Sequence, residues 1–89
     1  ARPATDEASL RSLSSDQPTV LLFENRAATD YTLFWLDFEG KRKTFGILRA
    51  GEKRGQNTFA THPWLVVKPD GQAVAIYVPG KPHGRVVLE

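Results

Sequence analysis

The sequence predicts an all-β protein, a single antiparallel β-sandwich of about seven strands. Short runs rich in β-branched and aromatic residues follow one another at intervals of roughly ten residues. The breaks between the runs contain Gly, Pro and Asp-Gly, which are the residues that tight turns require. No stretch of about eleven residues has the apolar spacing of a helix. Evenly spaced short strands of this kind are typical of a sandwich or a barrel.

Each strand is expected where apolar residues alternate between two turn signals. Residues 1–9, ARPATDEAS, lack this alternation and are predicted to form a disordered N-terminal linker, so the sandwich should occupy residues 10–89. The loop PGKPHG, residues 79–84, is expected to separate the last two strands. The strands are predicted at residues 20–25, 31–38, 42–48, 52–61, 64–68, 73–78 and 85–89.

Alternation along the strand at residues 31–38 raises a question about Trp35. If successive side chains point to opposite faces, Phe34, Leu36 and Phe38 share one face, and Trp35 lies on the other face with Asp37. We expect the first face in the core, and Trp35 on a partly exposed face. The same reasoning predicts that Val74, Ile76 and Val78 point inward, with Ala73, Ala75 and Tyr77 pointing outward, and that Val74 and Ile76 are buried.

A small binding pocket would explain an outward tryptophan. Thr58 is predicted to lie off the core face, and Pro63 interrupts the alternation so that His62 and Trp64 can reach the surface. Two indoles, a hydroxyl and an imidazole are a composition typical of a pocket. The alternative is that the tryptophans are ordinary core or half-buried residues and that His62 is a hydrogen-bonded loop residue.

Composition excludes several classes of protein. The chain has 89 residues, of which 40% are hydrophobic and 25% charged, and it contains no cysteine. Disulfides and thiolate metal sites are therefore excluded. No apolar run approaches the roughly 18 residues of a membrane span and no signal peptide is visible, so we expect a soluble chain whose compartment stays open.

Signatures of catalysis are also missing. The serines all lie within the first fifteen residues, and His62 and His83 are not placed at the spacing of metal ligands. We therefore expect a binding domain and no enzyme, with no catalytic residue, metal or cofactor.

A basic cluster surrounds the predicted hairpin, and the net charge is +2. Its simplest interpretation is a solvated strand edge that charge protects from aggregation. Binding of nucleic acid would require more positive charge with exposed stacking aromatics nearby, so we expect neither nucleic acid nor a membrane as a partner. The cluster comprises Lys41, Arg42, Lys43, Arg49, Lys53 and Arg54.

Several motifs in one order resemble the β domain of the von Hippel-Lindau tumour suppressor family. The opening run LRSLSSDQPTVLLFENR (10–26) matches the pattern L-R-S-x-x-S-x-x-P followed by F-x-N-R. FWLDFEG (34–40), GILRAGE (46–52), THPWLV (61–66) and IYVP (76–79) follow, with no gap needed from Leu10 to Trp64. The resemblance covers residues 10–89.

This resemblance implies a sandwich that recognises 4-hydroxyproline in an extended peptide, such as the degron of hypoxia-inducible factor. By position, Trp35 would pack against the pyrrolidine ring and Trp64 would form the back wall. Thr58 and His62 would hydrogen-bond the 4-hydroxyl. Phe45 stands where the family has tyrosine, and Thr58 where it has serine, so the affinity or the preferred flanking residues are expected to differ.

Three hypotheses for function remain open. The first is the hydroxyproline-binding domain that the resemblance implies. The second is an interaction or structural module of a larger protein that has kept the sandwich and lost hydroxyproline recognition. The third is a basic surface that binds nucleic acid or an acidic protein. The given sequence ends before any counterpart of the family's helical α domain, which binds elongin C, so we expect no ligase-receptor activity from it alone.

Overall fold

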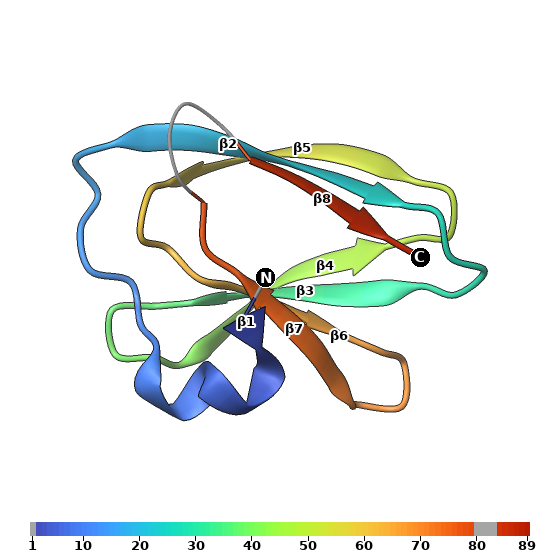
Figure 1. The fold of residues 1–89 in the computed structure, drawn as a ribbon, viewed down its shortest axis with the longest axis horizontal. Coiled ribbons are helices and arrows are strands. Elements are labelled where there is room, and N and C mark those ends of the chain that lie inside the picture. Colours follow the sequence, from blue (N-terminus) through green and yellow to red (C-terminus); the bar gives the residue numbers. More distant parts are fainter. Residues whose placement is uncertain (1, 80–83) are drawn as a thin grey trace.

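The computed structural model describes residues 2–79 and 84–89, which form two β-sheets packed face to face (Figure 1). The all-β sandwich predicted from the sequence is confirmed. Its elements are β1 (Arg2–Pro3), the short 3-10 helix η1 (Ala4–Ser9), β2 (Pro18–Asn25), β3 (Tyr31–Leu36), β4 (Arg42–Leu48), β5 (Lys53–Phe59), β6 (Trp64–Val67), β7 (Ala73–Tyr77) and β8 (Gly84–Leu88).

The larger sheet has the order β1-β7-β6-β3-β4 and the smaller one the order β5-β2-β8. The prediction of a wholly antiparallel sandwich is wrong at one pair, because β8 runs parallel to β2. The chain reaches β8 by crossing from the larger sheet to the smaller one. A crossover, unlike a tight hairpin, does not force its strand to be antiparallel to the neighbour. Residues 80–83, with most of the predicted 79–84 loop and His83, lie outside the described residues.

Both faces of the larger sheet are covered. The main core lies between the sheets, and a smaller cluster on the opposite face of the larger sheet contains Leu36, Leu65, Val67 and Ile76. All four residues of β6 are consequently buried. The buried members of the main core are Leu21, Phe23, Tyr31, Leu33, Leu48, Trp64, Val66, Val86 and Leu88.

The face of β3 that was predicted to point into the core is not the face that meets the second sheet. Leu33 is buried between the sheets and Trp35 packs against the same cluster, whereas Phe34 and Leu36 belong to the smaller cluster. Alternation correctly divides the side chains into two sets. It cannot tell which set meets the second sheet when both faces carry apolar residues and both are covered.

Three residues predicted to point inward are exposed, because a strand ends or the alternation breaks beside them. Val78 is 40% exposed since β7 ends at Tyr77. Phe38 is 45% exposed since β3 ends at Leu36, and the Asp37 carboxylate then accepts the backbone N–H of Glu39 and starts a turn. Val74 is 37% exposed because the register between β6 and β7 shifts there, which makes it the extra residue of a β-bulge. The predicted burial of Leu36 and Ile76 is confirmed.

The N-terminal segment also differs from the linker that its composition predicts. Arg2 and Pro3 pair with β7, and η1 follows directly (Figure 1). The Glu7 carboxylate accepts two hydrogen bonds from Arg42, at 2.7 and 2.8 Å, and Leu10 packs against the smaller cluster. The apolar outer face of the larger sheet is the reason for this order, since the segment helps to cover it.

On the outer face of the smaller sheet, Glu24 forms ion pairs with two arginines. Its carboxylate accepts hydrogen bonds from Arg26 at 2.6 Å and from Arg85 at 2.9 Å. These two bonds, that with Arg26 first, lower the pKa of Glu24 to about 2 from an ordinary 4.5. Because the folded-state pKa is depressed, the stabilisation is fully present above pH 4.5 and is lost as the pH falls toward 2.

We therefore expect Glu24→Gln to flatten the acid side of the stability profile. The melting temperature of the native protein should fall between pH 4.5 and 2 more steeply than that of the variant, measured by circular dichroism. Some slope should remain in the variant, because the pKa values of Glu7, Asp37 and Glu52 are also lowered by hydrogen bonds. Parallel profiles would show that the Glu24 ion pairs do not affect stability.

Candidate functional site: an aromatic pocket

A cavity of about 230 Å³ is lined mainly by aromatic side chains. It involves β4 and β5, which are edge strands of the two sheets, together with β3, β6 and adjacent loops. We call it the aromatic pocket. The residues that line it are Ser15, Trp35, Phe38, Phe45, Asn57, Thr58, Phe59, His62 and Trp64.

Sheet register places the two tryptophans of the pocket side by side. Trp35 in β3 is directly paired with Trp64 in β6, so their side chains leave the same face of the larger sheet. Trp64 is only 2% exposed and belongs to the main core, whereas Trp35 is partly exposed at the edge of that core. One indole is therefore mainly structural, and the other presents surface to the pocket.

A bulge in β4 directs Phe45 into the pocket. The register between β3 and β4 shifts at this point, and Gly46 adopts a positive φ of 89° that favours glycine. The Phe45 ring lies 4.9 Å from the Trp64 ring and 6.4 Å from the Trp35 ring, between centroids. Phe45 is nevertheless 42% exposed, so a ligand can reach its outer side.

A strained turn presents His62. Thr61, the residue before it, has a φ of 77° and is the one non-glycine residue of positive φ among residues 2–79 and 84–89. A β-branched side chain rarely adopts this conformation. The turn is held by hydrogen bonds from Ala60 N–H to Gln17 O and from His62 N–H to Phe59 O. The surrounding structure thus compensates for strain at a position that orients a pocket residue.

Relief of this strain should be measurable. We expect the free energy of unfolding of Thr61→Gly to exceed that of Thr61→Ala by about 1 kcal/mol, since glycine adopts the conformation freely and its larger unfolded-state entropy offsets only part of the gain. Thr61→Ala is the matched control, because it keeps the strained Cβ and loses the hydroxyl. Urea denaturation would compare the two variants, and a glycine variant no more stable than the alanine one would contradict the account.

The imidazole of His62 is fully engaged within the protein. Trp35 Nε1–H donates to Nδ1 at 3.1 Å, and Nε2 lies 2.7 Å from Ser14 O. Because an indole nitrogen can only donate, Nδ1 must be unprotonated and Nε2 must carry the proton. His62 is 4% exposed and also stacks on the Trp35 ring at 5.4 Å.

Thr58 has a different hydrogen-bonding state. Its Oγ1 accepts the Trp64 Nε1–H at 2.9 Å, and it is buried at the wall of the pocket. No residue of the described chain accepts the proton of its own hydroxyl. Since its oxygen already accepts the indole N–H, Thr58 can offer a ligand this proton as a donor.

Comparison with known proteins decides the family of this chain. The family model of the VHL beta domain matches residues 10–78, a range that includes every residue of the aromatic pocket. The chain belongs to the VHL beta domain family. This family consists of domains that recognise protein substrates. No curated protein matches the chain.

The five site residues that the resemblance implies for a VHL beta domain are brought together by the fold. Trp35, Phe45, Thr58, His62 and Trp64 all line the aromatic pocket. Their hydrogen bonds differ from the implied arrangement, in which His62 bonds the ligand hydroxyl, because the Trp35 indole already occupies His62 Nδ1.

Further lining residues of this VHL beta domain were not foreseen from the sequence. The sequence pattern places Phe38 and Phe59 in strands without pointing to the pocket, and it assigns no role to Ser15 or Asn57. A signal for Ser15 was present, because it occupies the second serine of the motif L-R-S-x-x-S-x-x-P. Its proximity to His62 depends on long-range contacts that the sequence does not reveal.

The three arginines of the basic cluster of this VHL beta domain contact other groups of the protein. Arg42 is bound by Glu7, and Arg49 lies 4.0 Å from Asp30. Arg54 donates hydrogen bonds to the Phe45 and Ile47 carbonyls on the edge of β4. These contacts favour a structural role for the arginines, in line with a protected strand edge.

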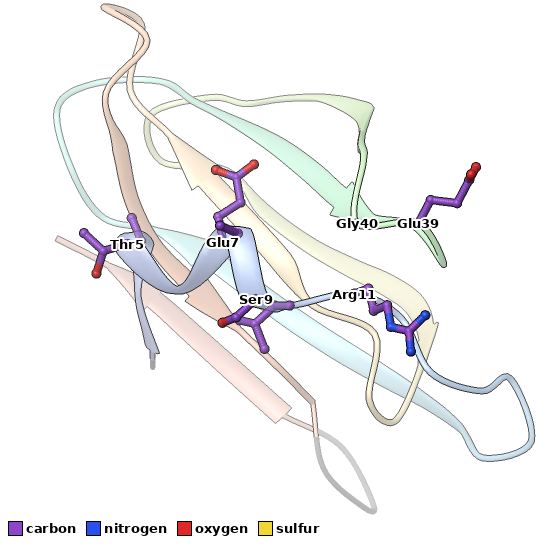
Figure 2. A pocket seen from close by; sticks show the side chains of 9 residues that line it. Thr5, Glu7, Ser9, Arg11, Glu39 and Gly40 are labelled. Atoms are coloured by element: carbon purple, nitrogen blue, oxygen red, sulfur yellow. The ribbon is translucent and has the colours of Figure 1, made fainter.

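A second and larger hollow, of about 600 Å³, lies where η1 passes the turn between β3 and β4 (Figure 2). Its labelled side chains include Glu7, Arg11 and Glu39, which point in different directions. A Cβ on Gly40 would lie 3.2 Å from Leu10 O, so the hollow forms where two backbone segments approach closely. It lacks the converging aromatic walls of the aromatic pocket.

Within residues 2–79 and 84–89, no group of three or more His, Cys, Asp or Glu side chains is placed to hold a metal ion. The same residues contain no helix long and apolar enough to cross a membrane.

Proposed function

We propose that this VHL beta domain binds a peptide that carries 4-hydroxyproline, with the pyrrolidine ring in the aromatic pocket. Trp35, Phe45 and Trp64 would form the apolar walls around the ring. Thr58 would donate its hydroxyl proton to the 4-hydroxyl oxygen, and His62 would line the polar side. The ligand that the resemblance implies is the prolyl-hydroxylated peptide of hypoxia-inducible factor.

The observation that carries this proposal is the state of Thr58. A buried hydroxyl, oriented by Trp64 Nε1–H at 2.9 Å, faces a mainly aromatic cavity with its proton unused by the described residues. An unmodified proline would exclude water from this donor and leave it unpaired, at a cost of about 1–3 kcal/mol. Because 1.4 kcal/mol is a factor of ten, hydroxylation should change the affinity by roughly tenfold or more.

A second candidate function is supported by the bond between Trp35 and His62. This 3.1 Å hydrogen bond occupies the imidazole nitrogen that could accept the proton of a ligand hydroxyl. The aromatic pocket would then serve an unmodified apolar side chain or proline, and the domain would act as a protein-interaction module without hydroxyproline recognition.

Titration calorimetry on the 89-residue chain separates these two functions. We expect the peptide of hypoxia-inducible factor with (4R)-hydroxyproline to bind roughly tenfold or more tightly than the same peptide with proline. The (4S) epimer is the matched control, because its hydroxyl lies on the opposite face of the ring and should give no gain. Equal affinities for the (4R) and unmodified peptides would favour the interaction module.

A further inference from the structure

A row of paired residues crosses the larger sheet from its core to its open edge. Trp64 in β6 pairs with Trp35 in β3, and Trp35 in turn pairs with Lys43 in β4. Residues directly opposite each other in antiparallel strands project from the same face of a sheet. Lys43 therefore leaves the face on which the two tryptophans line the aromatic pocket.

Phe45 places the same lysine beside the pocket along the strand. It lies two residues after Lys43 in β4, so alternation gives their side chains one face. The Phe45 ring is 6.4 Å from the Trp35 ring, between centroids, which agrees with this common face. Lys43 is exposed on an edge strand, just outside the residues that line the aromatic pocket. Its ammonium group is thus available at the rim.

Positive charge at this rim is not balanced by a neighbouring acid. Unlike the three arginines of the basic cluster, neither Lys41 nor Lys43 forms an ion pair with another of the described residues. Asp37 lies close by, but its Oδ1 already accepts the N–H groups of Glu39 and Lys41. The Lys41 hydrogen bond is the main reason why the pKa of Asp37 is lowered, and the charges of both lysines add a longer-range effect. The Glu39 side chain lies at the hollow beside η1 (Figure 2).

The border of the pocket at the Ser15 loop carries the opposite sign. Asp16 follows Ser15, is exposed, and accepts a hydrogen bond from the Ser14 hydroxyl at 2.8 Å. A ligand that extends beyond the aromatic pocket therefore meets positive charge along β4 and negative charge at this loop. Such an arrangement distinguishes ligands by where their charges lie and not only by their net charge.

We infer that Lys43 is a specificity-determining residue, which selects peptides with an acidic side chain beside the residue held in the aromatic pocket. Its ammonium is a compact charge on a flexible four-carbon stem, so it can reach a carboxylate that flanks the bound ring. Lys41 strengthens the same positive field. The inference rests on the proposed function, because a peptide residue must occupy the pocket, and it concerns the flanking residues and not the hydroxyl group.

Reversal of charge on both partners tests the inference. The hydroxylated peptide of hypoxia-inducible factor serves as host, and each residue flanking hydroxyproline is replaced singly by glutamate, glutamine or lysine. At one flanking position or more, the native protein should bind the glutamate peptide roughly twofold to fivefold more tightly than the glutamine peptide, the size of an exposed ion pair. Lys43→Glu should reverse this order, so that the lysine peptide binds most tightly. Titration calorimetry measures each affinity.

Lys53→Glu is the matched control, because it makes the same change in net charge at a different place. Lys53 pairs with Glu24 on the outer face of the smaller sheet, toward the end of β5 away from Thr58. Circular dichroism would establish that both variants are folded. The control should keep the native preference for glutamate, and added salt should weaken that preference in the native protein.

The outcomes separate this inference from the proposed function. Equal affinities for the glutamate and glutamine peptides at every position would overturn the inference, as would an equal change in Lys43→Glu and Lys53→Glu. Hydroxyproline recognition would survive both results, since the ratio between the (4R)-hydroxylated and unmodified peptides measures it separately. A ratio of one, with a glutamate preference that Lys43→Glu reverses, would overturn the proposed function and support selection by Lys43. Absence of binding by every peptide of the series would overturn both.

Discussion

Replacement of Trp64 by alanine is expected to lower the free energy of unfolding by about 3–5 kcal/mol, the usual cost of removing a buried aromatic side chain. Trp64 is 2% exposed, lies in the main core, and packs edge-on against Phe23 at 6.4 Å and Phe45 at 4.9 Å. The change also removes the donor to Thr58 Oγ1. In a domain of this size the loss is a large part of the total stability.

Trp35→Ala provides the matched control for this prediction. Trp35 is partly exposed and lies at the edge of the main core, so its removal should cost less stability than that of Trp64. It should nevertheless abolish peptide binding, because the indole forms a wall of the aromatic pocket and holds His62. Urea denaturation measures both stabilities. Equal losses would contradict the division into a structural and a ligand-facing tryptophan.

Local patterns in the sequence are sufficient to predict most strands. The run predicted at residues 42–48 matches β4, because it contains apolar residues and has turn residues on both sides. The face of β3 that meets the second sheet could not be predicted, since Phe34 and Leu36 are as apolar as Leu33 and Trp35. That choice depends on which sheet face the N-terminal segment covers.

The composition of the pocket was more predictable than its hydrogen bonds. Alternation and the break at Pro63 predict that Trp35, Thr58 and His62 share a partly exposed face. The fold does bring them to one cavity, but it buries Thr58 and His62 and leaves only Trp35 partly exposed. The bond from Trp35 to His62 and the approach of Ser15 depend on the strained turn at Thr61 and on a loop 47 residues away. No periodic pattern contains that information.

The Thr58 hydroxyl is expected to supply most of the discrimination between hydroxylated and unmodified peptides. Thr58→Val keeps the shape of the side chain and removes the donor, so an unmodified proline no longer leaves a desolvated hydroxyl unpaired. The variant should lose about 1–3 kcal/mol of stability, because Trp64 Nε1–H loses its acceptor. Thr58→Ser is the matched control, since it keeps the hydroxyl and omits only the methyl group.

The most direct test of this account is the affinity ratio between the two peptides, measured by titration calorimetry for the native protein, Thr58→Ser and Thr58→Val. Circular dichroism would first establish that each variant is folded. We predict a ratio of roughly ten or more for the native protein and for Thr58→Ser, falling to about threefold or less in Thr58→Val. A native ratio that Thr58→Val fully retains would contradict the claim that this hydroxyl reads the modification.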